Sequence, residues 1–369
     1  MLPSAPKDVG RHSEIFTSAL ASVGFQVENR MRLPKVDHSV VVLVDGLGDL
    51  NLKSAGGHAR FLNQQKNQPV RCEFPSSTAT SITGFATGVR SSEHGLIGYS
   101  VFDRDTGSIE NLLTGYADFN GGLERKAIPN LSDEFLTKLA VIGPSAYQFS
   151  GLTAITMTGA SYIPAETIED RFTAAISRAK SERHGFTYLY VPELDQLAHR
   201  YGFDSHQWLA ALENLDQILA KSVNEFPSNT GIIVTADHGI VDVSEAGRRM
   251  LSDSTQYIAM AKATAGDPRS NFVYFNDGIG FFEFQEMMFE EFPGQINVLS
   301  FDQLENAGWL GKFDSKFESI KPDAVLLWKD GLAGYDLRTA KPSHLKMIGQ
   351  HGGLSDFETK IPVIRMRAY

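Results

Sequence analysis

Three uncharged, β-branched runs that lead into acidic residues constrain the fold of this chain most strongly. The three runs and the carboxylates that follow them are Ser39–Val44 before Asp45, Phe186–Val191 before Asp195, and Gly231–Ala236 before Asp237. Runs without charge are typical of strands that are covered on both faces, as in a parallel sheet between helices. Because ligands collect beyond the carboxyl ends of such strands, we expect the three carboxylates to converge there.

Two intervals between these runs have the apolar spacing of covering helices. Ser205 can cap a helix whose apolar residues recur at helical spacing, and Pro227 lies just beyond its end. A second helix is predicted from about Ala165 to Ser181. The pattern therefore predicts an α/β fold with a mostly parallel central sheet sandwiched by helices.

The pattern changes between residues 257 and 341, where short aromatic runs such as Phe272–Phe275 alternate with helical pieces. A chain of 369 residues exceeds the size at which one domain usually stays undivided. We therefore predict a catalytic core of residues 1–256 and 342–369, with a smaller inserted α+β subdomain at 257–341. Within this insertion we expect Gly331–Tyr335 to be a surface loop, and pocket residues such as Tyr335 or Phe275 to select the leaving group. Ile361–Arg365 is predicted to be a closing strand.

Two histidines lie close to these carboxylates in the sequence. His199 follows Asp195 by four residues, so on a helix both side chains share a face and can chelate one ion. His238 directly follows Asp237, and the two can bind the same ion if the chain turns as it leaves the strand, which Gly239 permits. Taken singly, each pair also has a structural reading: a helix-start Asp with a surface His, or a polar pair after a strand.

A third histidine, His351, lies in the glycine-rich segment Gly349–Gly353, which suits a ligand delivered from a loop. A glycine-rich turn alone would also explain this segment. The full set offers three carboxylates and three imidazoles, which is what two divalent cations need. Three carboxylates facing two dications leave one positive charge for an anionic substrate. Nitrogen and oxygen ligands without sulfur suit zinc, although manganese or iron also fit.

Five hydroxyl side chains lie between Ser76 and Ser81, after Phe74 and Pro75. Thr78 is the candidate nucleophile, and Ser77 is the second choice. An alcohol is almost fully protonated at neutral pH, and a directly bound cation would lower its pKa. The chemistry of the residues alone does not choose among the five.

In order and in local sequence, these motifs resemble the alkaline phosphatase superfamily, and specifically its type I phosphodiesterase/nucleotide pyrophosphatase branch. The resemblance runs from Asp45 to the last strand, and it implies an alkaline phosphatase-like fold. The family spacing selects Thr78 as the nucleophile. It also implies that one metal is held by Asp195, His199 and His351, and the other by Asp45, Asp237, His238 and the Thr78 oxygen.

Two further residues are expected to bind substrate. The sequence after Thr78 is compatible with a helix start, so the backbone amide of Ala79 is predicted to donate to the developing charge. Relatives that cleave nucleotides place an asparagine where this chain has Tyr99. A tyrosine hydroxyl can donate one hydrogen bond in that role, and packing of Tyr99 within residues 98–102 is the alternative.

The expected function is a two-metal phosphoric ester hydrolase that acts on a phosphodiester or pyrophosphate-like bond through a phospho-threonine intermediate on Thr78. The alternatives are a phosphomutase or phosphonate hydrolase of the same superfamily, or a catalytically silent metal-binding homologue. The expected partner is a small-molecule phosphoester, and the sequence leaves the oligomeric state open.

Composition narrows the remaining function classes. A formal net charge of −10 argues against a nucleic-acid-binding surface, which would carry a basic stripe. The single cysteine, Cys72, excludes an internal disulfide and a cysteine-built zinc site, and we expect it to be a small buried residue. The N-terminal segment lacks the features of a signal peptide, and no apolar run is long enough to span a bilayer, so a cytoplasmic location is expected.

Overall fold

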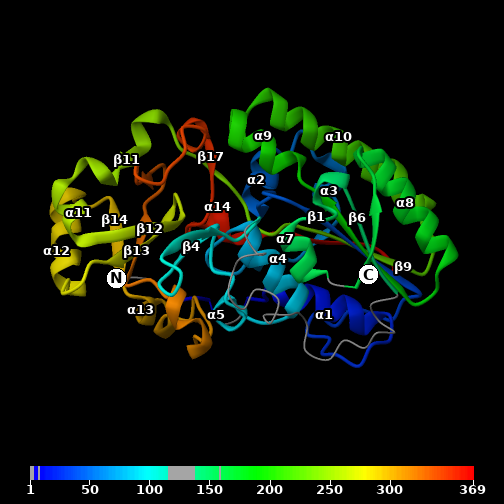
Figure 1. Ribbon diagram of the computed structural model, residues 1–369. Coiled ribbons are helices and arrows are strands. Elements are labelled where there is room, and N and C mark those ends of the chain that lie inside the picture. Colours follow the sequence, from blue (N-terminus) through cyan, green and yellow to red (C-terminus); the bar gives the residue numbers. More distant parts are fainter. Residues whose placement is uncertain (1–3, 7–8, 115–137, 158) are drawn as a thin grey trace.

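A seven-stranded sheet forms the centre of the computed structural model, which describes residues 4–6, 9–114, 138–157 and 159–369 (Figure 1). The strand order is β2-β19-β9-β1-β8-β6-β7. The central strand β1 (His38–Val44) pairs in parallel with β8 (Gly185–Val191) on one side and β9 (Thr230–Thr235) on the other. The three runs that the sequence predicted to be buried strands are therefore direct neighbours, and this prediction is confirmed.

The sheet continues beyond this parallel centre on both sides. Next to β8 it is extended in parallel by β6 (Leu139–Gly143) and β7 (Ser161–Pro164). Next to β9 lies β19 (Val363–Arg367), which is antiparallel to it and carries the short edge strand β2 (Lys66–Asn67). The sheet is therefore mostly parallel, as predicted, and the predicted closing strand is β19.

Helices cover both faces of this sheet (Figure 1). One face is covered by α8 (Ile168–Ser181) and α10 (His206–Ser222). The other face carries α1 (Ser13–Ser22), α4 (Thr78–Thr87) and α7 (Gly151–Thr156). The predicted α/β fold with a helix-flanked central sheet is confirmed.

The start of α10 follows directly from its sequence. The Ser205 hydroxyl accepts a hydrogen bond from the backbone amide of Trp208 at 3.2 Å, which satisfies one of the free amides of the first turn. Trp208, Leu212, Leu215 and Leu219 are all buried and form the stripe that packs on the sheet. Helical spacing of apolar residues therefore positions α10, and this helix carries none of the chemistry.

An aromatic cluster fixes α1 and α4 against the sheet. The Phe16 ring lies 4.9 Å from Phe85 on α4 and 4.9 Å from Phe186 on β8, measured between centroids. All three side chains are fully buried. Removing one such ring costs about 3–5 kcal/mol, because the cavity left behind collapses only in part. This packing holds the first turn of α4, which begins at Thr78, in a fixed place.

A second, antiparallel sheet lies in the sequence range predicted to be an insertion. Its order is β12 (Ala261–Asp267), β13 (Ser270–Phe275), β15 (Ala324–Trp328) and β14 (Ile296–Leu299). Helix α12 (Phe281–Glu291) packs with this sheet in an apolar cluster separate from the main core. The two sheets lie side by side in Figure 1. The limits of an inserted subdomain at residues 257 and 341 stay a prediction.

The prediction that Gly331–Tyr335 forms a surface loop is wrong. Residues Ala333–Tyr335 form the buried strand β16, which pairs in parallel with β11 (Arg248–Met250). Ala333 and Tyr335 pack in a small cluster with Val243. A run of three residues is too short to show the alternation of a strand, and its partner strand lies 85 residues earlier.

The remaining elements are short. The helices are α2 (Asp49–Ser54), α3 (Arg60–Asn63), α5 (Ser91–His94), α9 (Glu193–Tyr201), α11 (Thr255–Met260), α13 (Phe301–Asn306) and α14 (Asp356–Thr359). The strands are β3 (Val70–Arg71), β4 (Ser100–Asp103), β5 (Ser108–Asn111), β10 (Val241–Asp242), β17 (Gly349–Gln350) and β18 (Lys360–Ile361).

Two single features complete the fold. Within the described residues, no helix combines the length and the apolar character that crossing a membrane requires. Cys72 is buried and forms no disulfide, as its small size and isolation in the sequence predicted. The cytoplasmic location stays a prediction.

Candidate active site

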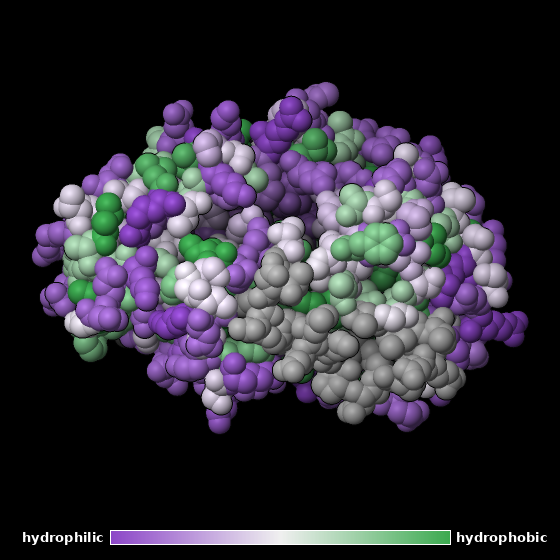
Figure 2. Space-filling view, in the orientation of Figure 1, coloured by the Kyte–Doolittle hydropathy of each residue, from purple (hydrophilic) through white to green (hydrophobic). Residues whose placement is uncertain are grey.

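The candidate site lies beyond the carboxyl ends of the three central strands. Asp45 follows β1, Asp195 lies in the first turn of α9 after β8, and Asp237 follows β9. Ligand atoms of Asp45, Asp237 and His238 lie within 4.8 Å of one another, and those of Asp195, His238 and His351 form a second such group. The structure thus brings together residues that are up to about 300 positions apart. Figure 2 shows the surface hollowed near its centre, with mainly hydrophilic side chains around the hollow.

Helix α9 places two side chains of the site one turn apart. Asp195 and His199 share a face of this helix, and His199 Nε2 lies 3.3 Å from Asp195 Oδ2. Burial alone would lower the pKa of His199, but the neighbouring carboxylate of Asp195 raises it to about 9. For Asp195, burial opposes the charge while His199 favours it, and the pKa of Asp195 is lowered. Metal binding at this pair requires the neutral imidazole of His199 and so competes with its proton.

The turn after β9 aims Asp237 and His238 at the same place. His238 Nε2 lies 3.5 Å from Asp237 Oδ2 and 3.4 Å from Asp45 Oδ1. The chain bends at Asp237 as it leaves β9, as expected. Gly239 has no positive φ and serves a close contact instead, since a Cβ there would lie 1.9 Å from the carbonyl oxygen of Phe357.

Each of the three imidazoles is oriented by a backbone carbonyl. Nδ1 of His199, His238 and His351 faces the carbonyl oxygens of Gly349 at 2.8 Å, Gly239 at 3.1 Å and Ser76 at 2.9 Å, respectively. A neutral ring that donates from Nδ1 keeps the Nε2 lone pair free, and metal-ligating histidines are commonly held in this way. The His238 and His351 rings are stacked, with centroids 3.8 Å apart.

Three carboxylate oxygens of the cluster are buried without a hydrogen-bond partner: Asp45 Oδ1, Asp195 Oδ1 and Asp237 Oδ2. Burying an unpaired charge is costly, so such atoms need an explanation. Burial and the other carboxylates raise the pKa of Asp45, and burial raises the pKa of Asp237. Divalent cations would satisfy all three oxygens, and carboxylates with imidazoles are ligands that zinc, manganese and iron accept.

Thr78 is the hydroxyl residue that meets this cluster. It is the first residue of α4, and its Oγ1 lies 3.1 Å from His238 Nε2. The Ser76 hydroxyl instead donates to the carbonyl of Gly353, and the Ser77 hydroxyl hydrogen-bonds to Asp267. Of the two candidates, Thr78 and Ser77, only the Thr78 hydroxyl faces the carboxylates and imidazoles.

A cavity of about 340 Å³ opens beside Thr78, Asp45 and Asp195. Four tyrosines line it together with aliphatic and threonine side chains. The tyrosines are Tyr147, Tyr162, Tyr188 and Tyr190. Among the described residues that line the cavity, Asp45 and Asp195 are the only charged ones. The cavity can therefore take an uncharged organic group.

The prediction that insertion residues line this pocket is wrong for both residues named. None of the described lining residues lies between 257 and 341. Tyr335 packs near Val243, and the Phe275 ring lies 4.8 Å from Phe284, centroid to centroid. The cavity is built instead from α4, β6, the 3-10 turn Ser145–Tyr147, α7, β7, β8 and α9.

Tyr190 is a residue of the site that the sequence did not reveal. Its hydroxyl donates a hydrogen bond to Asp45 Oδ2, and its ring lines the cavity. The Tyr147 ring packs edge-on against it, with centroids 5.5 Å apart. Tyr188 and Tyr190 are two positions apart on β8 and therefore share one face of the sheet. The spacing of the two tyrosines was the sequence feature that could have indicated Tyr190 as a residue of the site, but it also fits ordinary core packing.

Ala79 and Tyr99 were predicted to bind substrate. Ala79 is the second residue of α4, so its amide lies in the first turn of that helix. The Tyr99 ring packs edge-on against His344 at 6.1 Å between centroids, and its backbone amide donates to Asp267. Its hydroxyl hydrogen-bonds to Asn111, and it does not line the cavity. The substrate roles of both residues stay predictions.

Comparison with known proteins identifies the family. Residues 39–278 match the sequence pattern described as type I phosphodiesterase/nucleotide pyrophosphatase. This stretch is more than half of the chain, and it contains all proposed site residues except His351. No curated protein matches the chain.

Solved structures share the fold at low sequence identity. Murine ectonucleotide pyrophosphatase/phosphodiesterase 5, an inactive variant in complex with AMP, is 17% identical with a TM-score of 0.67, over 88% of this chain and 87% of that one. Phosphonoacetate hydrolase from Sinorhizobium meliloti, in complex with phosphonoacetate, is 17% identical with a TM-score of 0.65, over 90% and 91%. The chain belongs to the type I phosphodiesterase/nucleotide pyrophosphatase family and is a hydrolase of phosphoric ester bonds.

Proposed function

We propose that the protein hydrolyses a phosphodiester or pyrophosphate-like bond with Thr78 as the nucleophile and two divalent cations, most simply zinc, as cofactors. One observation carries this proposal. Thr78 Oγ1 lies 3.1 Å from His238 Nε2, where buried carboxylate oxygens without hydrogen-bond partners converge. An alcohol in that position is beside the positive charge that would lower its pKa.

The ligands are proposed to divide into two sets. Asp45, Asp237 and His238 hold one ion together with Thr78. The other ion is held by Asp195, His199 and His351. The first set is one of the close groups of ligand atoms; in the other close group His238 stands with Asp195 and His351, and the proposal replaces it by His199, whose Nε2 lies 3.3 Å from Asp195 Oδ2. When bound, such ions supply positive charge that stabilises an ionised alcohol and the charge that develops on a transferring phosphoryl group.

The chain itself supplies the nucleophile and the hydrogen-bond donors. Thr78 loses its hydroxyl proton to solvent, and its oxygen bonds to phosphorus as the bond to the leaving oxygen breaks. The phosphoryl oxygens then face the first turn of α4, where the amide of Ala79 can donate to them. In the second step water attacks the same phosphorus, the bond from phosphorus to the Thr78 oxygen breaks, and that oxygen takes up a proton released by the water.

A threonine as nucleophile is also supported by a relative. The murine enzyme bound to AMP is inactive and carries alanine in place of one threonine. AMP and phosphonoacetate are the ligands of two structures with this fold, and both contain a phosphorus oxyanion. A phosphorus centre at the proposed ions, with its organic group in the tyrosine-lined cavity, fits this pattern.

A phosphonate hydrolase is the second candidate. Phosphonoacetate carries a carboxylate besides its phosphorus group, and binding it calls for a second positive charge. The described lining of the cavity contains no lysine, arginine or histidine. This favours an ester with an uncharged organic group over a phosphonate that carries a second anion.

Hydrolysis of bis-p-nitrophenyl phosphate and p-nitrophenyl phosphate by zinc-loaded protein tests the proposal. We expect preference for the diester, and we expect Thr78→Ala to lose at least about a thousandfold in kcat with both ions still bound. Ser77→Ala is the matched comparison, and it should keep far more activity. Full activity in Thr78→Ala would refute the nucleophile. Conversion of ribose 1-phosphate to ribose 5-phosphate would establish a phosphomutase instead, and no turnover with both ions bound would favour the silent homologue.

A further inference from the structure

The turn between β12 and β13 lies deep in the molecule, although its sequence Asp267-Pro268-Arg269-Ser270 is that of an exposed turn. Asp267 is 2% exposed and Arg269 is 1% exposed. The hairpin belongs to the second sheet, and its tip, residues 267–270, reaches the loops that carry Thr78 and His351. Neither charged side chain lines the cavity or belongs to the groups of close ligand atoms.

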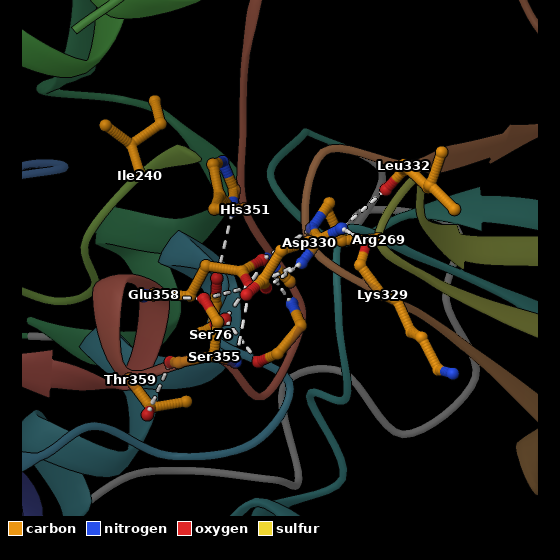
Figure 3. Close-up of polar contacts among 12 residues, drawn as sticks. Ser76, Ile240, Arg269, Lys329, Asp330, Leu332, His351, Ser355, Glu358 and Thr359 are labelled. Atoms are coloured by element: carbon orange, nitrogen blue, oxygen red, sulfur yellow. Dashed lines mark hydrogen bonds and ion pairs between the residues drawn. The ribbon is translucent and has the colours of Figure 1, made fainter. Parts of the chain in front are cut away.

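Arg269 forms a fully buried ion pair with Glu358. Arg269 Nε donates to Glu358 Oε1 at 3.1 Å, and Nη2 donates to Oε2 at 2.9 Å, which is the bidentate arrangement. Arg269 Nη1 also donates to the carbonyls of Lys329 and Leu332. Figure 3 shows Arg269 between Glu358 and the segment 329–332. The guanidinium thus fixes the Glu358 carboxylate from the side opposite the site.

Glu358 in turn holds the loop that delivers His351. Its Oε1 accepts from the amide of Gly353 at 2.8 Å, and Gly353 accepts from the Ser76 hydroxyl at 2.8 Å. The carbonyl of Ser76 faces His351 Nδ1 at 2.9 Å (Figure 3). Glu358 also accepts, with its backbone carbonyl, from the amide of Gly239, next to His238. The ion pair is therefore connected to two of the three imidazoles.

Asp267 supports the nucleophile loop from the same hairpin tip. Its carboxylate accepts from the amide of Tyr99 at 3.2 Å and hydrogen-bonds to the hydroxyl of Ser77, which precedes Thr78. It also packs directly against the His351 loop, since a Cβ at Gly352 would lie 2.4 Å from Asp267 Cβ. Gly352 has a φ of +107°, so only glycine fits this contact without strain.

We propose that the β12–β13 hairpin tip positions the catalytic centre: Arg269 acts through Glu358 on the placement of His351, and Asp267 acts through Ser77 on the placement of Thr78. Both are positioning residues. The inference rests on the proposed function, since it takes Thr78 as the nucleophile and His351 as a metal ligand. Stability alone explains the pair poorly, because a buried ion pair can often be replaced by apolar side chains without loss.

The Arg269→Lys variant of the full chain tests the first half of the proposal. It keeps the charge and loses the bidentate fork. We expect cobalt titration, followed by visible absorption and by competition with a chelator, to show one ion bound as in wild type and one bound about 10- to 100-fold more weakly. The control is Arg338→Lys in the same sheet region. Its partner Asp336 is also buried, at 1% side-chain exposure, and the pair is not connected to the site.

Asp267→Asn tests the second half and remains informative if Arg269→Lys does not fold. We expect it to keep the wild-type cobalt affinity at both sites while kcat for the diester falls about 10- to 100-fold, with KM little changed. A purely structural role would lower the melting temperature without this split between metal affinity and kcat.

The outcomes distinguish a failure of the positioning roles of Arg269 and Asp267 from a failure of the proposed function. Wild-type cobalt affinity and kcat in Arg269→Lys, equal to those of Arg338→Lys, would overturn the role of Arg269. Unchanged kcat in Asp267→Asn would overturn the role of Asp267. Failure of wild-type protein to bind two cobalt ions, or full turnover by Thr78→Ala, would instead refute the proposed function on which both rest.

Discussion

Removing the metal ions should lower the melting temperature of the wild type. A variant in which one carboxylate of the cluster is neutralised should be more stable than the wild type without metal and less stable than the wild type with metal. Without ions, Asp45 Oδ1, Asp195 Oδ1 and Asp237 Oδ2 have no hydrogen-bond partner. In Asp237→Asn, Oδ1 can still accept from the amides of Gly46 at 3.2 Å and His238 at 3.0 Å. Only the unpaired oxygen is replaced, by an amide that can donate to Asp45. The variant should therefore gain stability without metal and lose it with metal.

The sign of the stability change in Asp237→Asn follows from the direction in which the pKa of Asp237 is shifted. Burial raises the pKa of Asp237 in the folded state, so folding disfavours its ionised form. The contribution of this group to stability is favourable at low pH and is lost as the pH rises above the ordinary carboxyl value of 3.8. At pH 8 the metal-free wild type carries this penalty, and the metal-free asparagine variant does not.

The size of the metal effect follows from linkage. An ion present at a thousand times its Kd stabilises the fold by about 4.1 kcal/mol. Unfolding entropy is about 2.1 cal/mol/K per residue, which for 369 residues is about 0.8 kcal/mol/K. One ion should thus raise the melting temperature by about 5 °C, and two ions by about 10 °C.

Differential scanning calorimetry of zinc-loaded and chelated protein at pH 8, with metal content measured in each sample, checks this. Asp216→Asn is the matched control, because Asp216 is a buried carboxylate that accepts from the amides of Phe61 and Leu62. It should be less stable than wild type in both states, with the full response to chelation. Equal melting temperatures for loaded and fully chelated wild type, or an unchanged chelation response in Asp237→Asn, would refute the reasoning.

Three further outcomes follow from the site. Tyr190→Phe removes the donor to Asp45 and should weaken zinc binding about tenfold, measured by chelator competition; unchanged affinity would show that this hydrogen bond does not orient the ligand. Met157→Trp fills part of the 340 Å³ cavity and should lower kcat/KM for the diester about tenfold or more, whereas unchanged kinetics would place the organic group elsewhere. Burial raises the pKa of Asp267 to about 7, so its ionisation costs stability as the pH rises from about 4 to 7. The melting temperature of metal-free Asp267→Asn, relative to metal-free wild type, should therefore increase between pH 5 and 8, and a constant difference would contradict this assignment.

The sequence predicts the centre of the fold well, because buried parallel strands leave unbroken apolar runs. β1, β8 and β9 are such runs, and each is followed within a few residues by an aspartate of the site, Asp45, Asp195 or Asp237. Fold class and the gathering of the acidic and histidine side chains were accessible for this reason: both depend on local pattern and on the direction of three strands.

The tyrosine-lined cavity and the buried Arg269–Glu358 pair could not be predicted from the sequence in this way. Tyr147, in the 3-10 turn Ser145–Tyr147, and Tyr190 on β8 meet only through tertiary packing, and neither has a distinctive local sequence. Arg269 lies in a polar turn that any sequence rule places at the surface. Its burial depends on Glu358, about 90 residues later. Such features arise from tertiary contacts between segments with no shared pattern.

The antiparallel strand β19 has a consequence for the order in which the molecule can be made. It covers β9, a strand of sequence Thr-Gly-Ile-Ile-Val-Thr that otherwise presents unpaired backbone groups along one side. During synthesis, β9 emerges from the ribosome more than 120 residues before β19 does. Until then this apolar edge can pair with strands of other chains. A chain arrested before residue 363 should therefore aggregate and depend on chaperones, even with the other strands of its central sheet already synthesised.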